Sequence, residues 1–253
     1  MNDADLILAG IAAIAAGLVN ALAGGGTLIT FPVLTFLGIP PVAANVTNTV
    51  ALCPGYLGGS IAQRKDLTDQ KKRIFLLVPL AIAGGVGGGF LLLVSGEKIF
   101  SNLVPWLILF ASLLLAIQDP VRRMIFQRID RLTGKKNNLP AALVVAPAAI
   151  YGGYFGAGLG VILISVLGLL LDDNLVRLNA LKQLLSLCIN VAAAVFFLFS
   201  GQVYWVYAGV MAVCALLGGT LGGRLAGKLK PEILKWLIVV IGLTAAVLFF
   251  LKT

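Results

Sequence analysis

The chain has 253 residues, of which 60% are hydrophobic and only 11% are charged. Because a soluble globular protein carries about 25% charged residues, this composition excludes an ordinary soluble domain and predicts a polytopic membrane protein. The absence of histidine also excludes histidine-ligated metals, Ser-His-Asp triads and histidine proton relays.

Apolar segments of about the 20 residues that a membrane-spanning helix needs recur along the whole chain. In chain order they cover residues 5–23, 41–62, 74–95, 102–118, 140–156, 174–200, 203–223 and 232–251. The first ten residues lack the basic region of a signal peptide, so we expect the first segment to be retained as a helix. The predicted fold class is an all-α integral membrane protein, with one transmembrane domain over residues 1–253.

Two shorter apolar segments, Thr27–Leu37 and Gly160–Leu171, each follow a glycine cluster. Broken backbone is tolerated in a bilayer only where it is buried in protein or lines a wet cavity. We therefore predict two re-entrant, broken-helix hairpins, with tips at Gly24–Gly26 and Gly156–Gly160 that meet near the middle of the membrane. The alternative is that these glycines only permit close helix packing, which is the favoured interpretation for GGVGGG at 84–89 and GGTLGG at 218–223.

A shift of 134 residues aligns the two parts of the chain, because AGGG at 23–26 falls on AGLG at 157–160 and Asn45 falls on Asn179. The sequence thus predicts an inverted-topology repeat, in which each half is a hairpin followed by three transmembrane helices. The repeats cover about 5–118 and 139–252, and a basic linker covers about 119–138.

The net charge of +9 is confined to connections, which argues against nucleic acid as a partner. Fifteen of the nineteen lysines and arginines lie in residues 62–73, 119–138 and 224–235. Since such residues mark the cytoplasmic side, both termini are predicted to lie outside, although Lys98 and Lys252 then lie on the outer side.

The helices that begin at the two tips would present unpaired N–H groups and a positive dipole end, which favour an anion. Thr27 is placed to cap the first of them or to donate to a ligand. A stripe of polar residues from Asn179 to Asn190 at helical spacing, and the matching residues of the first repeat, would face the same cavity. The candidate site comprises Gly24, Gly25, Gly26, Thr27, Asn45, Asn48, Thr49, Gly158, Gly160, Asn179, Lys182, Gln183, Ser186 and Asn190.

Lys182 is the sharpest clue, because a charge within a span costs about 2.5–3.5 kcal/mol and marks a functional site by default. The alternative is a lysine that extends to the cytoplasmic interface. Arg177 is expected to pair with Asp172 or Asp173 instead. No predicted span contains Asp or Glu, which disfavours a cation pathway and suits a small oxyanion. Cys53, Cys188 and Cys214 lack metal-ligand spacing and are interpreted as packing residues.

The stretches AGGGTLITFPVLTFLGIP at 23–40 and LNALKQLLSLCINVAAAVFFLFSGQVYW at 178–205 resemble the TauE/SafE family of membrane anion exporters. The resemblance covers essentially the whole chain. It implies export of sulfite, sulfoacetate or a related organosulfonate across the bacterial plasma membrane, whereas the residues alone indicate only a small anion.

We therefore expect an alternating-access transporter with no cofactor and no enzymatic activity, whose partners are a small anion and the lipid bilayer. Two other functions stay open: an anion channel of the same architecture, and a membrane subunit of a redox complex. The sequence is compatible with a homodimer but determines neither the oligomeric state nor the coupling ion.

Overall fold

The computed structural model describes residues 2–118, 120, 139–171, 173–226 and 232–252. The predicted basic linker at about 119–138 therefore lies almost wholly outside the described residues, as does Asp172. The described helices are α1 (Asp3–Leu22), α2 (Thr27–Phe36), α3 (Pro41–Ala62), the short 3₁₀ helix η1 (Arg64–Leu67), α4 (Lys71–Ala116), α6 (Leu139–Tyr154), α7 (Leu159–Leu170), α8 (Leu175–Phe197), α9 (Trp205–Leu225) and α10 (Glu232–Lys252).

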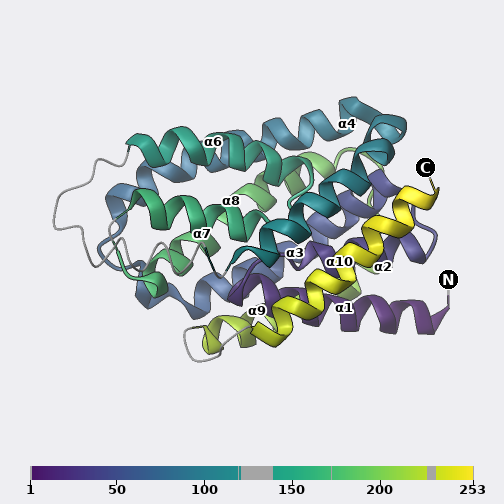
Figure 1. Cartoon of the computed structure of the whole chain (residues 1–253), viewed down its shortest axis with the longest axis horizontal. Helices are drawn as coiled ribbons and strands as arrows, with labels where there is room; N and C mark the ends of the chain where they lie inside the picture. Colours follow the sequence, from purple (N-terminus) through teal and green to yellow (C-terminus); the bar gives the residue numbers. More distant parts are fainter. Residues whose placement is uncertain (1, 119, 121–138, 172, 227–231, 253) are drawn as a thin grey trace.

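The described residues form helices and connecting segments without strands, which confirms the predicted all-α class. The predicted separation of residues 74–95 from residues 102–118 is confirmed. Helix α4 consists of two helical arms, and between them the backbone leaves helical geometry at Gly96, where φ is 68°. This conformation suits glycine because it has no β-carbon. Figure 1 shows that the chain turns back at this point, so the two arms of α4 run in opposite directions.

Four helices, α1, α4, α8 and α9, are long and apolar enough to cross a membrane among the described residues. Helix α3 has 22 residues, but its buried amides, hydroxyls and glycines make it less apolar. Helices α2 and α7 have only 10 and 12 residues, as their glycine-led sequences predict.

The two short helices return along the helices that precede them. In Figure 1, α1 runs inward from the right-hand end and α2 turns back toward that end, whereas α6 and α7 form the same arrangement from the left-hand end. Packing between α1 and α2 and between α6 and α7 agrees with this view. The two predicted broken-helix hairpins, with tips at Gly24–Gly26 and Gly156–Gly160, are therefore present.

Helices α3 and α8 pack against each other between the hairpins. Helix α9 packs on α1 and α3, and α4 packs on α6 and α8. An aromatic cluster joins the hairpins to each other: the Phe31 ring of α2 meets Phe155 edge-on at 5.3 Å and Phe100 of α4 at 6.3 Å between centroids. Such pairs stabilise beyond the area that they bury, so the hairpins are held together by a buried contact.

The two glycine-rich motifs bring helices into backbone contact, as the packing interpretation predicts. A β-carbon at Gly88 would overlap the Ile150 carbonyl of α6, and one at Gly218 would overlap the Ile14 carbonyl of α1. Each motif therefore lets a helix lie directly on one arm of a hairpin.

We expect Gly88→Ala to destabilise the fold by about 1–3 kcal/mol, because the added methyl overpacks the α4–α6 contact. Gly87→Ala is the matched control, since its β-carbon would meet nothing within 4 Å. That variant should be neutral or slightly stabilising because alanine favours helix. Thermal unfolding in detergent measures both, and equal melting temperatures would contradict the packing argument.

Candidate functional site

The backbone of the first hairpin tip adopts conformations that favour glycine over residues with a side chain. Gly24 and Gly25 have φ of 85° and 103°, a region that L side chains rarely adopt. The Gly24 N–H bonds back to the Val19 carbonyl at 2.9 Å and closes the end of α1. The chain then starts α2 at Thr27.

The second tip follows the same scheme and has the same length, because four residues separate the two helices at each tip. Gly156 and Gly158 have φ of 74° and 72°, and the Gly156 N–H bonds back to the Tyr151 carbonyl at 3.2 Å. Gly158 directly precedes α7. The tips touch, because a β-carbon on Gly24 or on Gly160 would lie 2.7 Å from the other residue's Cα. The predicted meeting of the two hairpin tips is thus observed.

Breaking α1 inside apolar surroundings leaves its last carbonyl groups without helical partners. Side chains from distant helices satisfy them. Lys182 donates from Nζ to the Asn20 carbonyl at 3.1 Å, Asn179 donates from Nδ2 to the Ala21 carbonyl at 3.1 Å, and Gln118 donates from Nε2 to the Ala23 carbonyl at 3.2 Å. The end of α1 is therefore completed by α8 and by the residue that follows α4.

Lys182 is 1% exposed, which excludes the alternative in which its ammonium extends to the interface. A cation at a helix C-terminus is favourable, because the carbonyls there carry partial negative charge. The ammonium thus offsets the negative end of α1 at Asn20, whose side chain also accepts from the Gly26 N–H at the start of α2.

The end of α6 is completed by neutral groups. Asn45 of α3 donates from Nδ2 to the Tyr154 carbonyl at 2.9 Å, and the Tyr151 hydroxyl donates to the Ala157 carbonyl at 2.6 Å. The shift of 134 residues aligns Asn45 with Asn179, and each donates to a carbonyl group at the end of the first helix of one hairpin. Only the first hairpin receives a charged partner in the described contacts.

Thr27 does not have its predicted capping role. Helix α2 begins at Thr27 with Gly26 as N-cap and no side-chain cap, because Thr27 lies one position inside the helix. Its hydroxyl instead accepts from Asn48 Nδ2 at 3.4 Å. The Gly26 N–H is satisfied by Asn20 Oδ1 at 2.8 Å. Asn20 was missed by the sequence analysis, although an asparagine four residues before a glycine cluster could have signalled it.

The remaining polar side chains divide into two groups. Thr49 and Asn190 bond to carbonyls of their own helices, those of Asn45 and Ser186. Gln183 is fully buried and both of its amide atoms lack a protein partner within the described chain, as do Asn45 Oδ1 and Asn48 Oδ1. Buried polar atoms without partners are costly, and so they mark positions where a ligand or water would bond.

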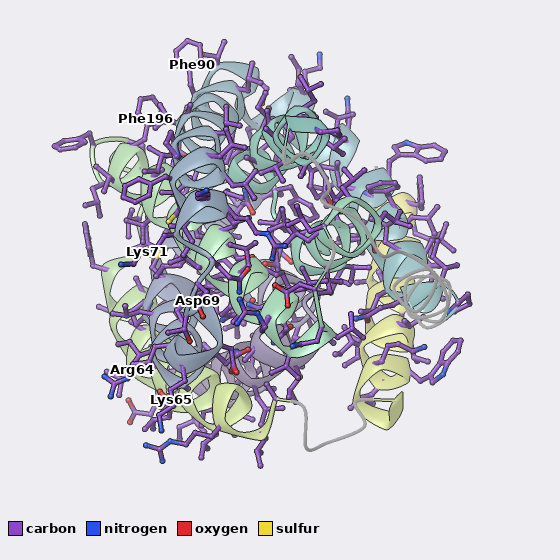
Figure 2. All side chains as sticks on the ribbon, turned by 90° about the vertical axis from the view of Figure 1, so that its left-hand side faces the viewer. Arg64, Lys65, Asp69, Lys71, Phe90 and Phe196 are labelled. Atoms are coloured by element: carbon purple, nitrogen blue, oxygen red, sulfur yellow. The ribbon has the colours of Figure 1, made fainter. Side chains whose placement is uncertain are left out.

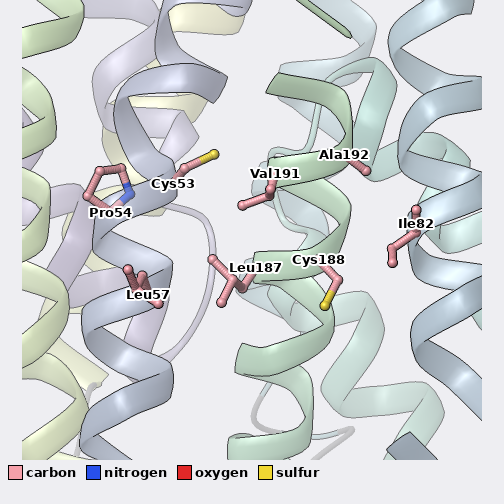
Figure 3. A pocket seen from close by; sticks show the side chains of 8 residues that line it. All are labelled: Cys53, Pro54, Leu57, Ile82, Leu187, Cys188, Val191 and Ala192. Atoms are coloured by element: carbon pink, nitrogen blue, oxygen red, sulfur yellow. The ribbon is translucent and has the colours of Figure 1, made fainter. Parts of the chain in front are cut away.

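The polar stripes do not line the pocket that opens between α3, α8 and α4. That pocket of about 490 Å³ is apolar (Figure 3), and Cys53 and Cys188 are free thiols in its wall. The cysteines there act as packing residues. At the start of α8, Arg177 Nε lies 2.9 Å from Asp173, as expected, and Arg73 of α4 also binds that carboxylate at 2.5 Å.

Comparison with known proteins identifies a family. The family model named "Sulfite exporter TauE/SafE" matches residues 9–249. The chain is 28% identical over 234 residues to the "Probable membrane transporter protein YfcA" of Escherichia coli strain K12, covering 90% of this chain and 83% of that protein. It is 28% identical over 230 residues to a "Probable membrane transporter protein" of Haemophilus influenzae, covering 89% and 86%. A "Probable membrane transporter protein ORF9" of a Sinorhizobium species is 25% identical over 241 residues, covering 94% and 89%.

We expect Asn45→Ala to lower the free energy of unfolding by about 1–3 kcal/mol, because the Tyr154 carbonyl loses its donor. The matched control is Ser112→Ala. Ser112 is also fully buried, but its hydroxyl bonds only to the Ile108 carbonyl of its own helix. Chemical unfolding in detergent compares them, and a larger loss for Ser112→Ala would contradict a helix-ending role for Asn45.

Proposed function

The chain belongs to the sulfite exporter TauE/SafE family and is a membrane transporter, and we propose that it exports a small sulfur-containing oxyanion bound at the two hairpin tips. Sulfite, sulfoacetate and related organosulfonates form the proposed substrate class. One observation carries the proposal: two helices begin at tips that touch through Gly24 and Gly160, beside the buried ammonium of Lys182.

Backbone N–H groups at the tips supply the proposed anion donors. Within the described residues, the N–H groups of Gly25 and Thr27 at the first tip, and of Gly158 and Gly160 at the second, donate to no protein acceptor. All four residues are buried. Helix N-termini with such groups bind oxyanions readily, because the donors and the dipole both favour negative charge.

The electrostatics of the two tips differ, and this difference favours the first tip as the stronger anion site. At each tip a helix C-terminus lies near a helix N-terminus, so their partial charges oppose each other. Lys182 neutralises the C-terminal end of α1 and leaves the positive end of α2 uncompensated. At the second tip Asn45 carries no charge, so the two ends cancel more nearly.

The polar side chains near the tips supply the proposed selectivity. Gln183, Asn45 and Asn48 have amide atoms without protein partners, which an oxyanion or its water could use. Asn179, Thr49, Ser186 and Asn190 complete the proposed set on α3 and α8, where they support the positions of these groups.

The proposed transport mechanism is alternating access between two inverted repeats, at about 5–118 and 139–252. Matching helix contacts support this division. The contact of α9 with α1 and α3 is matched by that of α4 with α6 and α8, and the contact of α2 with α10 is matched by that of α7 with α4. Rocking of the repeats about the touching tips would expose the anion alternately to each side.

The proposed orientation places both termini outside the bacterial plasma membrane. Helix α1 begins and α10 ends at the same end of the molecule (Figure 1). Arg64, Lys65 and Lys71 gather at the opposite end (Figure 2), and an excess of such residues marks the cytoplasmic side.

Lys182→Gln and Lys182→Ala should each lower sulfite or sulfonate flux about tenfold or more in reconstituted vesicles, because the site loses its positive charge. Lys71→Gln removes an exposed charge and should keep the wild-type rate. Unchanged flux in both Lys182 variants would remove the lysine from the mechanism. A saturating rate with exchange of anions would distinguish a carrier from a channel.

The same proteins in detergent test binding separately from transport. Sulfite, sulfate, thiosulfate, sulfoacetate and short carboxylates are each titrated, since a ligand that binds only the folded state raises the melting temperature with concentration. We expect stabilisation by sulfur oxyanions in the wild type and little in Lys182→Gln. Stabilisation by none of these anions would contradict the proposed substrate class.

Gln183→Leu should separate function from stability. The leucine fills a similar volume and removes two buried polar atoms without partners, so the melting temperature should stay equal or rise. Anion flux should fall about tenfold or more, because a selective hydrogen bond is lost. A lower melting temperature with unchanged flux would show that Gln183 is structural, and Ser112→Ala serves as the control outside the site.

A further inference from the structure

A second pocket, of about 400 Å³, lies between the end of α3, η1 and the end of α9. Its charged lining consists of Arg64 and Lys65 of η1 and Arg224 of α9. Figure 2 shows the side chains of Arg64 and Lys65 close together. The pocket is separate from the hairpin tips and from the proposed anion site.

The three cations are exposed and form no ion pair with any acid of the described part of the chain. Arg73 and Arg177 at the same end behave differently, because both bind Asp173. The pocket therefore concentrates uncompensated positive charge, which attracts an anionic group.

The rest of the lining is largely apolar and faces outward. Ile61 of α3 is 55% exposed and Leu216 of α9 is 39% exposed, and Leu216 lies about one turn from Thr220 along α9. Gly58 completes the α3 side without a side chain, so the groove stays open between the two helices. A free phosphate would contact only the cations, whereas a phospholipid could contact the cations with its headgroup and these apolar side chains with its acyl chain.

We propose that this pocket binds an anionic phospholipid of the adjacent leaflet. Arg64, Lys65 and Arg224 bind the phosphate and headgroup, and an acyl chain lies along Ile61 and Leu216. Basic pockets at the cytoplasmic ends of membrane helices bind anionic headgroups by this chemistry. The contact would tie α3 to α9 at the membrane surface, and it requires neither the proposed substrate nor the proposed transport cycle.

Native mass spectrometry of the purified protein tests the proposal with phosphatidylglycerol, phosphatidylcholine and inorganic phosphate as probes. We expect the wild type to retain phosphatidylglycerol in preference to phosphatidylcholine. The double variant Arg64→Gln/Arg224→Gln should bind phosphatidylglycerol about tenfold or more weakly, since each cation contributes severalfold to the affinity. The matched control Lys71→Gln/Lys72→Gln removes two exposed charges outside the pocket and should bind like the wild type.

The single variants Arg64→Gln and Arg224→Gln should each show an intermediate loss, which keeps the test valid if the double variant fails to fold. Equal loss in the Lys71→Gln/Lys72→Gln control would overturn the proposal, because it would indicate only general surface charge. Equal retention of phosphatidylcholine, or displacement of the lipid by inorganic phosphate at the same concentration, would overturn it too.

Discussion

The fold depends on satisfying backbone groups where a helix stops inside apolar surroundings. Water is absent there, so each exposed carbonyl must find a partner in the protein. Lys182, Asn179 and Gln118 bond to the end of α1, and Asn45 bonds to the end of α6. These partners can reach the tips because glycines let α4 and α9 lie directly against the hairpins and against α3 and α8. The broken helices therefore depend on the close helix packing, which brings the hydrogen-bond partners to their ends.

The elements were largely predictable because their signals are local. Apolar length located the helices, and glycine clusters located the hairpin tips. The polar stripe on α8 was identified from its spacing, but sequence could not show what each member bonds. Lys182 and Asn179 bond to helix-end carbonyls at tertiary contacts, and Thr27 lies one residue too late to act as a cap. The break between residues 74–95 and 102–118 was predicted, but its turn at Gly96 could not be, because apolar length gives no turn geometry.

The same residues link stability to the proposed transport. A lysine that only completed a helix end could be replaced by a neutral donor, as Asn45 does at α6. Its positive charge offsets the negative end of α1, and in the proposed mechanism it also attracts the anion to the tip. Gln183 and Asn48 also have buried amide atoms without protein partners, and these atoms lower the stability of the protein without a ligand. In the proposed mechanism the bound anion or its water supplies the missing hydrogen bonds.

The bonds to the end of α1 have a consequence for how the protein is made. Lys182 lies 162 residues after Asn20, and Asn179 lies 158 residues after Ala21. During synthesis, the first broken helix enters the bilayer long before the ribosome has produced the groups that complete it. Its tip must therefore be shielded by the insertion machinery or by lipid headgroups until α8 arrives. A chain truncated before α8 would lack the donors that bond to the Asn20 and Ala21 carbonyls, so the end of α1 would stay incomplete.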